Sequence, residues 1–516
     1  MPVKNIKSTL LSIIGISILL IVPDFIFSLV NKSFKLPHSL NVLFVIIPLS
    51  AAIVFNKYKL FSKIIITLIF ILQFLQFSNI AYFGNQLSPY ALILMQSEIN
   101  DVLLETKNSF LNFLYIIPIV LIPCLLMWGM LKIKTIKNKI GTFFLVVFFT
   151  VPGISLYKIN VPRYLPNEVD FTIVNSLKAF FGYFILNIKQ CKIKNYDDYQ
   201  VIDLKSDNYQ EPITIVYIIG ESVNYRHMSL FGYNRKTTPK LENLAKEKNV
   251  YYAKGISGGI ATMASTKFMM NIIYEADNIN QMLKEDTNLF KLAKSKGFKT
   301  FYLSAQSDTL LSSVGCAKYI DELFTRNSDR KNIDKFKDEY LFEILDSKKF
   351  DKKNFIVLHQ RSIHAPYPKT FSENYKDKKI FKNSDNETID DYDNAMLYND
   401  YLISKMFERF NKQKNGKYYI VWASDHNELL GEREIWGHGH GYLYPELGDI
   451  PFLFQSNDEN FLNEIKKINK PTHYEVGKKI ANIIGYEIKN PNEEKNFCYL
   501  SGIDPIKNCG FLKLKK

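Results

Sequence analysis

The sequence lacks the patterns that mark the common nucleotide-binding folds. It has neither a P-loop nor a GxGxxG segment placed between a strand and a helix. An Arg-rich helix and a repeat of basic and aromatic residues are also missing, although the formal net charge is +14. Scattered basic residues do not predict nucleic-acid binding, and a positive surface beside anionic lipids explains the charge more simply.

Charged residues are scarce up to about residue 158, where Leu, Ile, Val and Phe dominate. Five nearly uncharged stretches follow one another there: 8–30, which holds a lone Asp24, 36–56, 64–80 and onward, 108–131 and 140–157. A helix needs about 20 apolar residues to cross a bilayer core of roughly 30 Å. The stretches approach that length and lack amphipathic spacing, so they predict five transmembrane helices rather than buried helices of a soluble core. Asp24 fits the outer end of the first helix, or a substrate path.

Lysines are distributed unevenly between the loops that join these stretches. Nine lie before the first stretch or in the loops after the second and fourth, and three lie in the other two loops. The positive-inside rule then places the N-terminus in the cytoplasm and everything after residue 158 outside. We therefore expect a transmembrane domain at 1–159, an external connector with membrane-surface helices at 160–210, and a catalytic domain at 211–516.

From residue 211 onward, short apolar runs alternate with helix-like segments. Four runs predict buried strands: 213–219, 300–303, 355–358 and 418–421. Two segments predict helices between them: 287–296 and 398–410. This alternation is typical of an α/β domain with a mostly parallel central sheet covered on both faces.

Residues able to bind a metal follow two of these strands. Glu221 comes after the first strand, and Asp425 and His426 come after the fourth. Because the carboxyl ends of parallel strands share one edge of a sheet, these side chains should converge. Their oxygen and nitrogen atoms are ligands that suit zinc, so the sequence predicts a metal site at this edge.

Further histidines lie nearby along the chain. The third strand runs on through His359 to His364, and the loop 436–440 holds His438 and His440. They strengthen the prediction of a metal site, although the loop by itself also fits a glycine-rich surface turn.

A nucleophile that attacks a phosphate is expected at a helix start, where free N–H groups and the helix dipole favour an anion. The glycine-rich segment 255–268 leads into an apolar helix expected at 268–274, and it contains three candidate hydroxyls: Ser257, Thr262 and Ser265. An ordinary hydroxyl hardly ionises at neutral pH, and metal coordination would activate it. Each of the three residues also fits an N-cap.

Four segments carry a family resemblance: IVYIIGESVNYRHMSLFGYNRKTTPKLENL at 215–244, LHQRSIHAPYPKTF at 358–371, YDNAMLYNDYLISKM at 392–406 and SDHNELLGEREIWGHGHGY at 424–442. Together with the five apolar stretches, they are similar to the bacterial phosphoethanolamine transferases of the alkaline phosphatase superfamily. The resemblance implies an alkaline-phosphatase-like (sulfatase-like) fold, zinc, and a covalent phosphothreonine intermediate. It implies transfer of phosphoethanolamine from phosphatidylethanolamine to a cell-envelope glycolipid.

The resemblance also implies four zinc ligands: Glu221, Thr262, Asp425 and His426. Thr262 would be the nucleophile, and His364 and His438 would line the substrate phosphate or a second metal ion. A local structural role fits His359 and His440 at least as well. The enzyme would be a monomer in the bacterial inner membrane with a periplasmic catalytic domain, and the acceptor stays open between a lipid A phosphate, a core heptose and another envelope glycan.

The chain departs from the family pattern at several positions. Asn224 stands where the family often has Arg, and Ile363 stands at a Ser of the His-x-x-x-Ser-His segment. The other departures are Gly258-Gly259-Ile260 for Cys-Gly-Thr, Lys267 for a proline, and Asn427 and Leu429 for small residues. They bear on the contacts with donor and acceptor more than on the metal site.

Three rival functions fit less well. A sulfatase would need a Cys-x-Pro-x-Arg context, whereas Cys316 precedes Ala-Lys-Tyr-Ile. A phosphoglycerol transferase shares the five spans and the Thr nucleophile, but the YDNxxxYxD and SLFGYxRxTTP segments favour ethanolamine. The joint presence of Glu, Thr, Asp and His at the site argues against an inactive membrane sensor or scaffold.

Five cysteines add a redox hint. Cys124 lies in a predicted span. The other four lie in the part expected outside, where disulfides persist, and allow three connectivities: Cys191, Cys316, Cys498 and Cys509.

The lysine distribution predicts that a reporter fused after residue 210 lies outside the cytoplasm. A reporter that is active only outside should work in this fusion, because an odd number of spans precedes it. Activity of a reporter that works only in the cytoplasm would overturn the predicted orientation.

Overall fold

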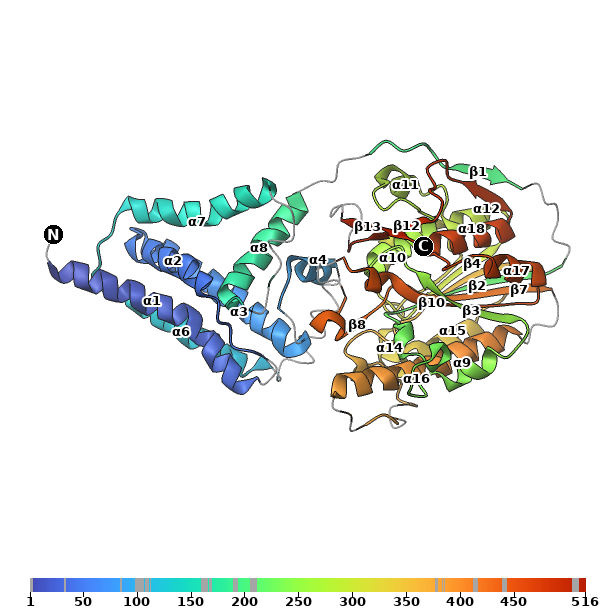
Figure 1. The fold of residues 1–516 in the computed structure, drawn as a ribbon, viewed down its shortest axis with the longest axis horizontal. Helices are drawn as coiled ribbons and strands as arrows, with labels where there is room; N and C mark the ends of the chain where they lie inside the picture. The colour runs from blue at the N-terminus through green and yellow to red at the C-terminus, as the bar shows by residue number, and fades with distance from the viewer. Residues whose placement is uncertain are drawn as a thin grey trace. The chain divides into compact units, whose positions relative to one another are not determined.

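The computed structural model describes the chain apart from these residues: 1–2, 32–33, 84–85, 98–105, 107–110, 112, 159–165, 167–168, 189–193, 205–210, 376–378, 383, 385, 412–415, 439–442 and 504–509. The chain divides into two compact units (Figure 1). Met1–Gln190 forms the first, and Cys191–Gly439 with Leu443–Lys516 forms the second.

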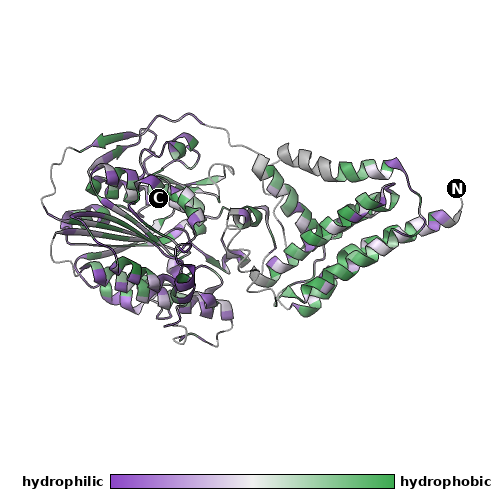
Figure 2. Ribbon diagram, turned by 180° about the vertical axis from the view of Figure 1, so that it is seen from behind, coloured by the Kyte–Doolittle hydropathy of each residue, from purple (hydrophilic) through white to green (hydrophobic). Residues whose placement is uncertain are grey.

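The first unit is built from helices. Its described helices are α1 (Val3–Val30), α2 (Leu43–Phe55), α3 (Lys59–Phe83), α4 (Pro89–Ser97), α6 (Ile116–Met130), α7 (Lys139–Lys158) and α8 (Thr172–Ile188). Apolar residues run along most of their length (Figure 2). Among the described residues, two segments are long and apolar enough to cross a membrane, Asn5–Val30 and Lys59–Ala81. Three shorter apolar helices accompany them, so the count of five spans stays a prediction.

Asp24 is fully buried among these helices. Its Oδ1 accepts from the Thr172 N–H at 2.9 Å, and its Oδ2 accepts from the Thr172 hydroxyl at 2.8 Å. Thr172 begins α8, so Asp24 satisfies an N–H group that a helix start leaves unpaired. Helix α8 contacts α3, α4 and α7. This part of the expected connector therefore packs within the helical unit.

A seven-stranded sheet forms the centre of the second unit, in the order β3-β10-β7-β2-β6-β4-β5. Its strands are β2 (Ile213–Gly220), β3 (Val250–Ile256), β4 (Lys299–Ser304), β5 (Glu322–Phe324), β6 (Lys353–His359), β7 (Lys417–Ser424) and β10 (Asp449–Ser456). The four strands predicted from apolar runs are confirmed as β2, β4, β6 and β7. Strands β7, β2, β6, β4 and β5 are parallel, whereas β10 is antiparallel to both neighbours and makes the sheet mixed.

Helices cover both faces of this sheet (Figure 1). One apolar core holds Ile215 and Tyr217 of β2, and the other holds Val216 and Ile218, as the alternation of a strand requires. The first core also includes residues of α10 (Thr262–Asn271), α12 (Leu289–Ser295), α17 (Glu459–Lys466) and α18 (His473–Ile484). The second includes residues of α9 (Pro239–Leu244), α14 (Arg330–Phe336), α15 (Tyr340–Asp346) and α16 (Glu387–Asn411).

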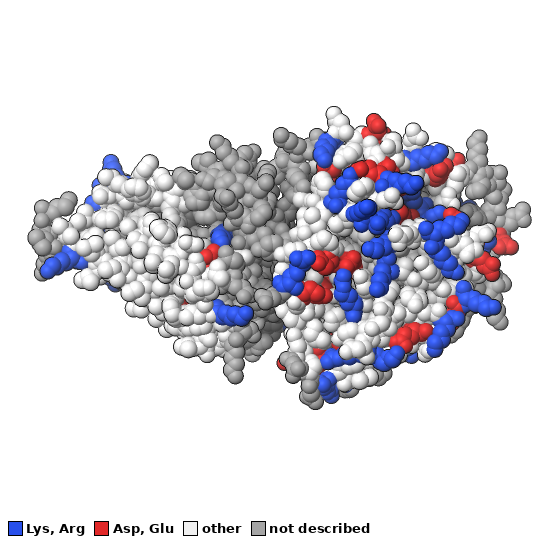
Figure 3. Space-filling model, viewed as in Figure 1, with Lys and Arg blue, Asp and Glu red and all other residues white. Residues whose placement is uncertain are grey.

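Smaller elements complete the second unit. They are β1 (Gln200–Asp203), α11 (Ile279–Lys284), α13 (Leu311–Val314), β8 (Leu429–Leu430), β9 (Trp436–Gly437), β11 (Tyr486–Lys489), β12 (Phe497–Ser501) and β13 (Phe511–Lys515). Strand β1, from the expected connector, pairs with β11. Basic and acidic side chains are interspersed on the face of this unit drawn in Figure 3. Cys316 and Cys498 are unpaired in the described part, and Cys191 and Cys509 lie outside it.

Candidate metal centre

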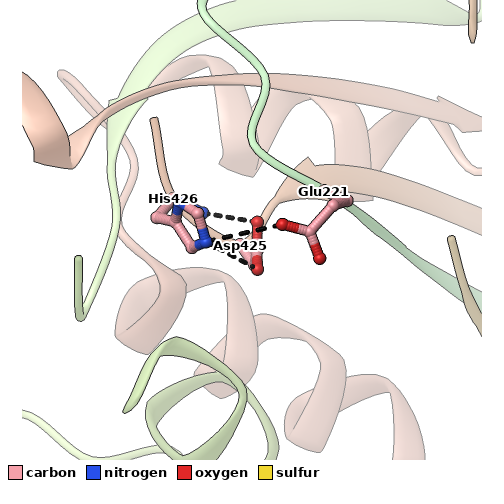
Figure 4. Close-up of side chains that lie close together, drawn as sticks. All are labelled: Glu221, Asp425 and His426. Atoms are coloured by element: carbon pink, nitrogen blue, oxygen red, sulfur yellow. Dashed lines mark hydrogen bonds and ion pairs between the residues drawn. The ribbon is translucent and has the colours of Figure 1, made fainter. Parts of the chain in front are cut away.

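Two neighbouring strands bring the predicted metal ligands together. Strands β2 and β7 are parallel and in register, with Gly220 opposite Ser424. The next residues are Glu221 after β2, and Asp425 and His426 after β7. Each of these three offers a ligand atom within 4.8 Å of the others, and all three are buried. Figure 4 shows their polar atoms facing one another.

Among the described residues, one carboxylate oxygen of this triad, Asp425 Oδ2, has no hydrogen-bond partner. His426 Nε2 lies 3.5 Å from Glu221 Oε1 and 3.3 Å from Asp425 Oδ2. His426 Nδ1 donates to the Asn427 carbonyl at 3.0 Å, so the lone pair is on Nε2. Asp425 Oδ1 accepts from the N–H groups of Ser222 and His426, whereas its Oδ2 has no hydrogen-bond partner among the described residues. A buried bare carboxylate oxygen beside an imidazole lone pair fits a bound cation.

Electrostatics point the same way. Burial, with the charge of Asp425, raises the pKa of Glu221 to about 7, and burial raises the pKa of Asp425 to about 6. Burial lowers the pKa of His426 to about 4, so its ring is neutral and able to bind a metal at neutral pH. A divalent cation would offset the repulsion between the two buried carboxylates.

The Thr262 hydroxyl meets the triad. Its Oγ1 lies 3.4 Å from both Glu221 Oε2 and His426 Nε2. Thr262 is the first residue of α10, and the N-cap, Ala261, has no side-chain cap bond. The helix therefore begins six residues before the start of the helix expected at 268–274. Because the first N–H groups of a helix have no partner within it, donors for an anion lie beside this hydroxyl.

The two competing hydroxyls are engaged with backbone. Ser257 Oγ lies 2.5 Å from the Asp425 carbonyl oxygen and 2.7 Å from that of Gly259. Ser265 Oγ lies 3.0 Å from the same Gly259 oxygen. Of the three candidates, Thr262 is the one that faces the triad.

Two of the predicted histidines lie beside the triad. The ring centroids of His438 and His426 are 4.1 Å apart, and those of His438 and His364 are 6.3 Å apart. His438 Nδ1 lies 2.6 Å from Glu428 Oε2, and the other oxygen of Glu428 accepts from the Tyr367 hydroxyl at 3.0 Å. Burial alone would lower the pKa of His438, but the charge and hydrogen bond of Glu428 outweigh it and raise the pKa to about 9. The ring is therefore an imidazolium at neutral pH.

The other histidines differ from His438. Burial, with the nearby charge of Arg361, lowers the pKa of His364 to about 3, so this ring is neutral. His359 is fully buried, and its Nδ1 lies 2.8 Å from the Tyr302 hydroxyl, a contact within the core of the domain. His440 lies outside the described residues.

Sequence reasoning missed residues that support the triad. Gln306 Nε2 donates to Glu221 Oε2 at 2.6 Å, and its Oε1 accepts from the Arg361 guanidinium at 3.0 Å. Such contacts orient a metal ligand. Gln306 follows β4 as Glu221 follows β2, and this place after a strand is a sequence signal. No sequence pattern distinguishes the amide of Gln306 as a site residue. The same holds for the carboxylate of Glu428, which lies within a loop.

The sheet and the buried group at its carboxyl edge define an α/β domain built around a metal site. A family model described as Sulfatase matches residues 213–473, more than half of the chain. The chain therefore belongs to the sulfatase family, and phosphoethanolamine transferases are among the proteins that it resembles.

Three similar proteins illustrate this grouping. The Kdo(2)-lipid A phosphoethanolamine 7''-transferase of Salmonella typhimurium is 29% identical over 317 residues, 57% of this chain and 55% of that protein, so the match spans about half the length of this relative. The integral membrane lipooligosaccharide phosphoethanolamine transferase A (EptA) of Neisseria meningitidis has a TM-score of 0.59 at 16% identity and covers 92% of this chain and 95% of its own. The periplasmic domain of Escherichia coli EptC, in complex with Zn, has a TM-score of 0.50 at 21% identity and covers 62% and 96%.

We expect replacement of Asp425 by Ala to abolish divalent-metal binding, because the ligands that stay cannot complete a four-ligand site. Zinc affinity of the purified full-length protein, measured by competition with a chelator, should fall by more than the roughly 10–100-fold typical of a lost outer-shell contact. Asp449→Ala is the matched control, since this carboxylate pairs with Arg226 outside the triad. Full zinc occupancy in the folded Asp425→Ala protein would contradict the assignment.

Proposed function

We propose that this chain transfers phosphoethanolamine from phosphatidylethanolamine to a cell-envelope glycolipid through a covalent intermediate on Thr262. The observation that carries the proposal is the position of Thr262 Oγ1, 3.4 Å from both Glu221 Oε2 and His426 Nε2. A hydroxyl among metal-ligand atoms at a helix start is what a phosphoryl-transfer nucleophile needs. The activities for which the Salmonella and Neisseria relatives are named support the class of acceptor.

Zinc is the metal that we propose for the site. Four residues would hold one ion: Glu221, Thr262, Asp425 and His426. Their oxygen and nitrogen atoms suit zinc. Asp425 Oδ2, which has no hydrogen-bond partner among the residues that the structure describes, supports a cation there. When bound, zinc would lower the pKa of the Thr262 hydroxyl and neutralise charge on the phosphoryl oxygens. A second ion beside His364 and His438 is left open.

Several side chains have separate roles in the first half-reaction. Thr262, which has already released its hydroxyl proton to solvent, attacks through Oγ. A bond forms from Oγ to the phosphorus of the donor, and the bond from phosphorus to the diacylglycerol oxygen breaks. His438, held as an imidazolium by Glu428, gives its proton to that departing oxygen. The first N–H groups of α10 donate to the phosphoryl oxygens, and His364 lines the same phosphate.

The second half-reaction reverses these roles. An oxygen of the acceptor attacks the same phosphorus, the bond from phosphorus to Thr262 Oγ breaks, and Thr262 leaves as the alkoxide. The proton of the acceptor hydroxyl returns to His438, which restores the imidazolium. The acceptor would be a lipid A phosphate, a core heptose or another envelope glycan. A phosphate that attacks as its dianion brings no proton, and His438 then takes its proton from solvent.

A membrane location suits a lipid donor. We propose that the protein is a monomer that crosses the bacterial inner membrane five times. Its N-terminus would lie in the cytoplasm, and its catalytic domain, from residue 211, would lie in the periplasm. The long and short apolar helices of the first unit support the spans. The excess of lysines in alternate loops supports the orientation.

Incubation with phosphatidylethanolamine and no acceptor should add one phosphoethanolamine group to the protein. Peptide mapping should place it on Thr262, and Thr262→Ala should lack it and lose transfer by roughly 10³-fold or more. Intact-mass spectrometry and a transfer assay measure the two effects. Phosphatidylglycerol, tested in parallel, should leave the mass unchanged, since its adduct would indicate a phosphoglycerol transferase.

Ser265→Ala is the matched control. Ser265 is one turn further along α10, and its hydroxyl donates to backbone, so its loss should cost about 1 kcal/mol of stability and leave the adduct on Thr262. A folded Thr262→Ala protein that transfers at a near-normal rate would refute the proposed nucleophile.

A further inference from the structure

The segment before Thr262, residues 256–261, is here called the nucleophile loop. Four backbone hydrogen bonds outside the strand pairing tie it to segments that lie far along the chain. One runs from the Ser501 N–H to the Gly258 carbonyl at 2.8 Å. Ile256 N–H donates to the Pro471 carbonyl at 2.9 Å, and Ile260 N–H donates to the Ser501 carbonyl at 3.1 Å. Ser257 N–H donates to the Gly448 carbonyl at 2.8 Å. The loop is therefore held by C-terminal elements.

His473 adds a side-chain link at this point. It is the first residue of α18 and is fully buried. Its Nδ1 accepts from the Gly258 N–H at 3.1 Å, and its Nε2 donates to the Ser424 carbonyl at 2.9 Å. A backbone N–H can only donate and a carbonyl can only accept, so these partners define a neutral ring with its proton on Nε2.

The two partners of His473 belong to different parts of the candidate centre. Ser424 ends β7 directly before Asp425 and His426, and Gly258 lies in the nucleophile loop four residues before Thr262. The planar ring thus spans the gap between the strand that carries two of the triad residues and the loop that carries the hydroxyl.

The loop packs closely against α10 at two glycines. A Cβ added to Gly258 would meet the Cβ of Phe268 at 2.5 Å, and one added to Gly259 would meet the Cβ of Ala264 at 2.8 Å. At these two positions the space between the loop and the helix is therefore too small for a side chain. A displacement of Gly258 therefore reaches Thr262, the first residue of α10.

We propose that His473 is a positioning residue that sets the distance between Thr262 Oγ1 and the Glu221–Asp425–His426 triad. The inference rests on the proposed function, because it concerns the attack by Thr262. His473 acts through Gly258 and Ser424 and contacts no substrate. A shift of about 1 Å in a reacting group can cost roughly 10²-fold in rate, which is the scale of effect that lost positioning predicts.

The first test replaces His473 by Phe, which keeps a ring and removes both hydrogen bonds. Formation of the Thr262 adduct from phosphatidylethanolamine should slow by about 10- to 100-fold. The zinc affinity of the same full-length protein should fall by a smaller factor than the rate, because three of the four proposed ligands, Glu221, Asp425 and His426, directly follow β2 and β7 and keep their places. The KM for the donor should be unchanged, so that the loss falls on kcat.

Two polar variants separate the two hydrogen bonds of His473. His473→Asn offers an amide oxygen near the place of Nδ1 and can keep the Gly258 bond, whereas His473→Gln offers an amide nitrogen near the place of Nε2 and can keep the Ser424 bond. Each should recover part of the rate lost in His473→Phe. If the Phe variant does not fold, these two decide alone, and wild-type rates in both would overturn the proposal.

Tyr474→Phe is the matched control. Tyr474 is the next residue of α18 and is buried, and its hydroxyl donates to Glu493 at 2.8 Å, away from the nucleophile loop. This variant should keep the wild-type rate of adduct formation. Equal losses of zinc affinity and rate in His473→Phe would indicate a general structural role and overturn the inference. An unmodified wild-type protein would instead reject the proposed function itself.

Discussion

The in-register pairing of β2 with β7 is the constraint on which the candidate centre depends. Gly220 lies opposite Ser424, so the residues after the two strands emerge together at one edge of the sheet. Successive side chains of a strand point to opposite faces, and a slip of one residue would turn Glu221 away from its partners. A Cβ at Gly220 would meet the Trp422 ring at 2.9 Å, so the packing of this ring against β2 favours glycine there. The register of the two backbones thus determines whether the three candidate metal ligands meet.

This register places two carboxylates close together in an apolar interior, which destabilises their charged forms. Glu221 and Asp425 are both buried, and burial raises the pKa of each. The donors around them, from Ser222 and Gln306 to Glu221 and from backbone N–H groups to Asp425, reduce the cost of burial without removing the repulsion. A cation would supply the missing opposite charge, so its binding energy would also stabilise the folded domain.

The residues of the centre differ in how far a sequence reveals them. Glu221 and Asp425 are predictable because they end continuous apolar runs that read as buried strands. Thr262 is not separable from its neighbouring hydroxyls, because α10 begins after Ala261, which carries no capping side chain. Gln306 and His473 act through hydrogen bonds to partners far away in the chain, and no local pattern encodes such contacts. The apolar stretch at 36–56 in the helical unit likewise does not reveal where its helix begins. Ser39 caps a short 3-10 turn, and the α-helix begins only at Leu43.

Buried acids elsewhere in the chain clarify what sets the triad apart. Both oxygens of Asp24 are paired with Thr172. Asp393 is equally buried, and its Oδ2 accepts from the Arg235 guanidinium at 2.8 Å. A fold can therefore bury a carboxylate by surrounding it with donors, as these two sites do. Within the described part of the chain, Asp425 Oδ1 accepts hydrogen bonds, whereas its Oδ2 has no hydrogen-bond partner and lies beside the lone pair of an imidazole. The assignment of a metal to this edge follows from that incomplete pairing more than from the presence of Asp and His in the sequence.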